Sequence, residues 1–211
     1  MRWGLLIGAV AGACTSEPEP SECRQYRDDA GTPTAVDIVI RNDRAETLLL
    51  TQPCGDFAVH LESDRGWTSA TSLCNTSCGQ RFDIAECTAC FTCLGVSYFS
   101  LAPGEQVVLR WSGNLFEHAS PAPECFAADA CGDSCDARRI PRDGTIDIRV
   151  EAITDAECVA AEPDPSVCTC TPGPIGCEVE GTATIAPTIS LRESFDMAAA
   201  AASGTVSFVL E

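Results

Sequence analysis

The chain has 211 residues and a formal net charge of −18, because 31 acidic residues outnumber 13 arginines and there is no lysine. A surface this acidic repels polyanions, which excludes nucleic acid and anionic lipid headgroups as primary partners. The length suffices for one large domain or two small ones.

The first residues predict an export signal. Arg2 precedes an apolar run, Trp3 to Ala13, that is too short to cross a bilayer as a helix. The run ends in the small residues Ala11-Gly12-Ala13, directly before Cys14. This ending resembles the lipobox of bacterial lipoproteins, which implies a signal peptide over residues 1–13 and a lipid on Cys14. An ordinary signal peptide cut at the same small residues is the alternative.

Residues 14–34 are expected to form a lipid-anchored polar tether, because Thr15 to Pro20 is polar and carries two prolines. Residues 35–211 then form one domain. We expect the protein in the cell envelope, held by its lipid at the outer membrane or cell surface, or secreted if it lacks the lipid. Its expected contact is the membrane through that lipid, and a protein partner is a further candidate.

Fifteen cysteines in an exported chain predict a disulfide framework. If Cys14 carries lipid, an even number remains, which permits complete pairing. The predicted disulfide cysteines are Cys23, Cys54, Cys74, Cys78, Cys87, Cys90, Cys93, Cys125, Cys131, Cys135, Cys158, Cys168, Cys170 and Cys177.

The spacing of these cysteines restricts their pairing. One group, from Cys74 to Cys93, has five members, and another, from Cys125 to Cys135, has three. Complete pairing therefore favours a bridge between these two groups. The four cysteines from Cys158 to Cys177 are expected to pair among themselves, and Cys23 is expected to pair with Cys54.

Strand signals recur along the chain as short β-branched or alternating runs bounded by turn residues. The run from Val96 to Leu101 is followed by the turn Ala102 to Glu105, which predicts a hairpin with Gln106 to Trp111. Only Met197 to Ala202 indicates a helix. The predicted strands are residues 36–41, 47–51, 57–62, 96–101, 106–111, 145–151, 182–191 and 205–210.

This pattern predicts an all-β fold, an immunoglobulin-like antiparallel β-sandwich of about eight strands with long disulfide-rich loop insertions. Three segments carry a resemblance to secreted immunoglobulin-like bacterial domains of the BsuPI protease-inhibitor type. They are Asn42, Asp64-Arg65-Gly66-Trp67, and Leu101 to Glu105 leading to Trp111-Ser112-Gly113. The resemblance implies a sandwich and a protease-inhibitory role.

Two local motifs suggest chemistry. The spacing of Cys87, Cys90 and Cys93 suits a thiolate site for a soft metal ion, but dense thiols in an oxidising compartment become disulfides. Gly132-Asp133-Ser134 resembles the nucleophile segment of trypsin-like proteases, but the sequence identifies no histidine with an aspartate partner.

The sequence therefore predicts a non-catalytic cell-envelope lipoprotein with a binding or structural role. No cofactor, metal or catalytic residue is expected. The alternatives are an extracellular protease inhibitor and a thiolate metal-binding protein that uses Cys87, Cys90 and Cys93.

Overall fold

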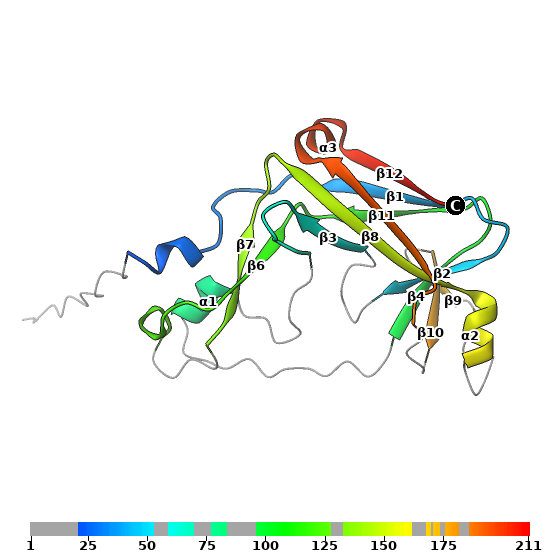
Figure 1. Ribbon diagram of the computed structural model, residues 1–211, viewed down its shortest axis with the longest axis horizontal. Helices are drawn as coiled ribbons and strands as arrows, with labels where there is room; N and C mark the ends of the chain where they lie inside the picture. The colour runs from blue at the N-terminus through cyan, green and yellow to red at the C-terminus, as the bar shows by residue number, and fades with distance from the viewer. Residues whose placement is uncertain are drawn as a thin grey trace, which may run out of the picture.

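The computed structural model describes residues 21–52, 59–69, 77–83, 96–127, 133–161, 168–169, 171–173, 176–181 and 186–211. Its body consists of two β-sheets that face each other, with a two-stranded ribbon projecting from one end (Figure 1). This confirms the predicted all-β, sandwich-like class. The immunoglobulin-like identity stays a prediction.

The smaller sheet has three strands in the order β12–β1–β5. They are β1 (Val36–Asn42), β5 (Gln106–Trp111) and β12 (Thr205–Leu210). The pairing of β1 with β5 is antiparallel, whereas its pairing with β12 is parallel, which departs from the predicted antiparallel sandwich. The two ends of the domain sequence therefore lie side by side in one sheet.

The larger sheet has the order β11–β8–β2–β4–β10–β9, and β3 also pairs with β8. The ten-residue strand β8 pairs with β11 along one side and with β2 and β3, end to end, along the other. The bounds are β2 (Leu48–Gln52), β3 (Val59–Ser63), β4 (Val96–Leu101), β8 (Thr145–Thr154), β9 (Thr171–Gly173), β10 (Gly176–Gly181) and β11 (Ile189–Asp196).

The core forms because apolar residues alternate along the strands, which directs them to one face of each sheet. In β8, Ile146, Ile148 and Val150 are buried between the sheets. They meet buried residues of β1 such as Ile38 and Ile40 in the same cluster. Each such side chain contributes about 1.5–3 kcal/mol of hydrophobic stabilisation.

The projecting ribbon pairs β6 (Leu115–Ala119) with β7 (Cys135–Arg139). The helix α1 (Cys78–Asp83) packs on β7, and the 3-10 helices η1 (Arg24–Tyr26) and η2 (Pro123–Cys125) complete this part. We call these five elements the cystine lobe. Figure 1 shows it at the opposite end of the molecule from α2 (Asp155–Ala161).

The predicted helix at 197–202 is confirmed as α3 (Met197–Ser203), which begins at the N-cap Asp196 and ends at Gly204 with φ 74°. The sequence prediction missed α1, α2, β6, β7, β9 and β10.

In α2, hydrogen bonds from the Thr154 backbone amide and the Thr188 hydroxyl lower the pKa of Glu157.

The predicted hairpin of residues 96–101 and 106–111 is wrong, although both strands exist with these bounds. β4 pairs with β2 and β10 in the larger sheet, while β5 pairs with β1 in the smaller one. The turn between them crosses from one sheet to the other. Turn residues specify a change of direction, and they do not specify which strand becomes the neighbour.

Asn42 holds this crossing turn in place. It is completely buried, and its side-chain amide donates hydrogen bonds to the carbonyls of Leu101, 2.8 Å away, and Glu46, 2.9 Å away. Its side-chain oxygen accepts from the Arg44 amide, and its backbone bonds to Gly104 and Glu105. The side-chain amide, the side-chain oxygen, the backbone N–H and the backbone C=O of Asn42 therefore all have hydrogen-bond partners.

We expect Asn42→Ala to lower the free energy of unfolding by about 3 kcal/mol, because it leaves buried carbonyl groups without donors. Asn42→Asp should cost at least as much, since it places a carboxylate oxygen against them. Asp43→Ala, in the same turn, removes only an exposed contact with Arg41 and should have little effect. Urea unfolding measures all three, and equal losses for the Asn42 and Asp43 variants would contradict this role.

Candidate functional site

Several predicted site residues lie outside the described residues. They are Cys14, Cys54, Cys74, Cys87, Cys90, Cys93, Cys131 and Cys170. Cys177 lies in β10, opposite Ser100 of β4. The other six predicted disulfide cysteines form three bridges: Cys23–Cys125, Cys78–Cys135 and Cys158–Cys168.

Two of these bridges agree with the pairing expected from the sequence. Cys78–Cys135 joins the five-cysteine group to the three-cysteine group, and Cys158–Cys168 closes within the last group. The expected pair of Cys23 with Cys54 is wrong, because Cys23 bonds to Cys125. The N-terminal segment folds onto the ribbon, so the cysteine nearest to Cys23 in space comes from η2, 102 residues further along the chain.

The N-terminal segment covers the outer edge of β7. The Asp29 amide donates to the Arg138 carbonyl, and the Arg138 amide donates to the Asp28 carboxylate. The Ile140 amide donates to the Asp29 carboxylate. From Cys23 onward, the segment expected as a tether is therefore bound to the domain.

Arg139 connects three segments of the cystine lobe. Its side chain is 8% exposed and contacts the Glu117 carboxylate of β6 and the Asp29 carboxylate. It also donates hydrogen bonds of 2.7 Å to the carbonyls of Gln25 and Arg27. A planar guanidinium suits such convergent acceptors, because it presents five donors in a fixed geometry.

A second contact holds the same segment to α1. The Arg27 guanidinium forms a bidentate pair with the Asp83 carboxylate, at 2.9 and 3.0 Å. This hydrogen-bonded pair lowers the pKa of Asp83. Arg27 also lies over the Phe82 ring, which contacts Phe126 edge to face.

The ribbon carries a histidine–aspartate pair that the sequence analysis did not find. His118 and Asp136 are directly opposite each other on β6 and β7, with Nδ1 and Oδ1 2.8 Å apart. The histidine side chain is 69% exposed, whereas that of Asp136 is 6% exposed. The buried carboxylate fixes the orientation of the imidazole ring, as it does for a histidine that acts as a general base. Among the described residues, however, no hydroxyl or thiol hydrogen-bonds to the ring.

A different surface lies at β11, the edge strand of the larger sheet. On its outer face a groove of about 410 Å³ extends across β11, β8 and β3. Its floor carries a cross-strand row of basic side chains: His60, Arg149 and Arg192 are opposite one another in register. Arg149 lies 3.4 Å from Glu151, whereas Arg192 forms no ion pair with a described residue.

On the inner side of β11, a slot of about 550 Å³ separates this strand from β12. Ile189, Leu191 and Phe208 contribute apolar surface, and Glu193 and Glu211 contribute carboxylates. The slot exists because β11 and β12 belong to different sheets and are joined through α3 (Figure 1). The β11 strand thus has a groove on each side.

Neither surface provides a metal site within the part of the chain that the structure describes, since no three His, Cys, Asp or Glu side chains there are placed to share an ion. No helix among the described residues is long and apolar enough to span a bilayer. No family model, curated protein or solved structure matches the chain.

We expect Arg139→Met to lower the free energy of unfolding by about 3 kcal/mol, because it removes the cation beside two carboxylates and leaves two backbone carbonyls of the cystine lobe without this donor. The matched control is Arg110→Met, since Arg110 forms one ion pair with Asp37 and is 71% exposed. Denaturant unfolding should show little change for that control. Equal losses in the two variants would contradict a structural role for Arg139.

The disulfides should contribute unequally to stability. Replacing Cys23 and Cys125 by serine removes a closure of 102 residues, which costs about 4.7 kcal/mol in the chain-entropy account. Replacing Cys158 and Cys168 removes a closure of ten residues, which costs about 3 kcal/mol. Unfolding curves of the two double variants test the order, and a larger loss for the shorter closure would be contrary to it.

Proposed function

We propose that this protein is an exported, lipid-anchored envelope protein with a non-catalytic binding role. Cys14 is the proposed lipidated residue. The observation that supports export best is that the described residues include three disulfides, since bridges of this kind persist in oxidising compartments outside the cytosol.

The fixed position of Cys23 supports the anchored arrangement. Cys23 is fully buried and bonded to Cys125 in the cystine lobe. It follows Cys14 by nine residues, which extend to at most about 30 Å. A lipid on Cys14 would therefore hold the cystine lobe close to the membrane and direct the opposite end of the sandwich away from it.

The side chains of the β6–β7 ribbon and of the β11 edge agree with a binding role. The pair of His118 and Asp136 has an orienting carboxylate without a nucleophile among the described residues. By contrast, the β11 edge offers open grooves, unpaired charge and apolar surface together. Such mixed surfaces are typical of recognition sites.

We expect Cys14→Ser to release the protein from membranes or to block its processing. The matched control is Cys23→Ser, which also replaces one cysteine by serine but leaves Cys14 intact, and it should stay with the membrane fraction. Fractionation and intact mass measure both. A Cys14→Ser protein that matures normally and still sediments with membranes would overturn the proposal.

A further inference from the structure

We propose that the edge of β11 that faces away from β8 is a docking site for an extended segment of a partner protein, added as an antiparallel strand. The segment alternates apolar and polar residues and places a basic side chain opposite Glu193 and an acidic one opposite Arg192. This inference rests on the proposed binding role and names the chemistry of the partner.

The backbone of β11 is open to such an addition. Among the described residues, β11 pairs with β8 alone, over eight consecutive positions. Since the N–H and C=O groups of a strand point to both sides, about half of those in β11 face away from β8. Addition of a strand at such an edge gives affinity through main-chain hydrogen bonds.

The inner side of the edge selects apolar residues. Ile189, Leu191 and Phe195 are opposite the buried residues of β8 and are themselves half-buried. The Phe195 ring contacts Trp111 and Phe208 in the core. An added strand would direct every second side chain into the slot beside them, completing their burial.

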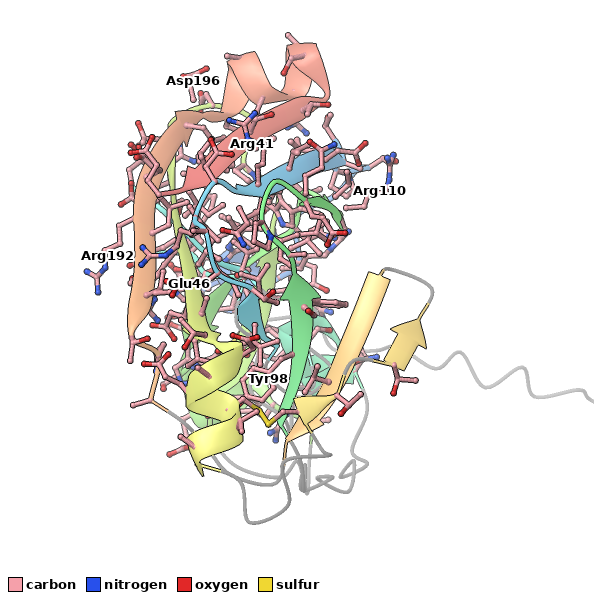
Figure 2. The ribbon with its side chains drawn as sticks, turned by 90° about the vertical axis from the view of Figure 1, so that its right-hand side faces the viewer. Arg41, Glu46, Tyr98, Arg110, Arg192 and Asp196 are labelled. Carbon is pink, nitrogen blue, oxygen red and sulfur yellow. A yellow bond between two sulfur atoms is a disulfide. The ribbon has the colours of Figure 1, made fainter. Side chains whose placement is uncertain are left out.

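The charges of the edge select the polar residues. Glu193 lies on the inner face opposite the buried Ile148, although it is exposed itself, so a basic side chain beside it would pair with it. Arg192 lies on the outer face opposite Arg149, where like charges repel. Figure 2 shows Arg192 pointing away from the body of the protein. An acidic side chain beside it would relieve that repulsion.

A second copy of this chain fits the edge poorly. Directly opposite residues of an antiparallel pair have their side chains on the same face of the sheet. When β11 pairs with β11 of a second copy about a twofold axis, the axis therefore passes through one residue position, and that residue is opposite its own copy. The central registers place Arg192 opposite Arg192 or Glu193 opposite Glu193, and both are repulsive. The net charge of −18 adds to the repulsion between copies.

These constraints define a probe. Reading antiparallel to β11 from Phe195 to Ile189, the favoured sequence is Val-Thr-Lys-Glu-Val-Thr-Val. Its control, Val-Thr-Glu-Lys-Val-Thr-Val, has the same composition with the two charges exchanged. For the full, oxidised chain we expect the control to bind about tenfold more weakly, since two attractive pairs become repulsive.

Exchanging the charges on the protein provides the decisive variant. Arg192→Glu with Glu193→Lys leaves the net charge unchanged and should reverse the preference between the peptides. The matched control exchanges the exposed cross-strand pair of Asp37 and Arg110 on the smaller sheet, as Asp37→Arg with Arg110→Asp. Arg110 projects on the other side of the molecule from Arg192 (Figure 2), so this control should retain the original preference.

Titration calorimetry measures the binding of the two peptides, and sedimentation of the protein alone measures whether it forms a dimer. Absence of binding, equal binding of both peptides, or an unchanged preference in the Arg192 and Glu193 variant overturns the proposal. A dimer that this variant dissociates would assign the edge to a second copy and overturn it as well. None of these results depends on Cys14, so fractionation of Cys14→Ser tests the anchor separately.

Discussion

The buried amide of Asn42 is the contact on which the arrangement of the two sheets depends. Asn42 ends β1 in the smaller sheet and hydrogen-bonds to Leu101 at the end of β4 in the larger one. The chain must cross between the sheets at this point, where the ladder of hydrogen bonds ends. A side chain with both donors and an acceptor satisfies the carbonyls that the crossing would otherwise bury unpaired.

The cystine lobe is stabilised in a different way from the sandwich. Among the described residues, its buried cluster consists of the small side chains of Cys78, Ala119, Cys135 and Ala137. Little apolar area is available there, so disulfides, the Arg139 contacts and the pair of Arg27 with Asp83 hold the segments together. Polar contacts and crosslinks therefore hold this lobe, whereas the large apolar core holds the sandwich.

The β11 edge combines exposure with partial protection. Exposed edge strands invite unwanted pairing, and an inward-facing charge such as Glu193 is one way in which proteins prevent it. The same charge admits a partner strand that supplies a cation at that position. Protection against most strands and acceptance of one kind therefore depend on the same side chain.

The sequence by itself determined several strands that are bounded by turn residues. Residues 96–101, 106–111 and 205–210 have the predicted bounds, because β-branched and aromatic runs between turn residues are a local property of the chain. The missed helices also had local signals. Ser77 with Gln80 and Thr154 with Glu157 form reciprocal capping boxes at α1 and α2.

Only the tertiary structure decided which strands became neighbours. The parallel pair of β1 and β12, the bond from Cys23 to Cys125, and the contact of His118 with Asp136 join residues through the packing of whole segments. The slot between β11 and β12 arises in the same way, since it lies between elements of two sheets. Local patterns fix which face of a strand is apolar, but long-range pairing is selected by the total burial and hydrogen bonding of the folded chain.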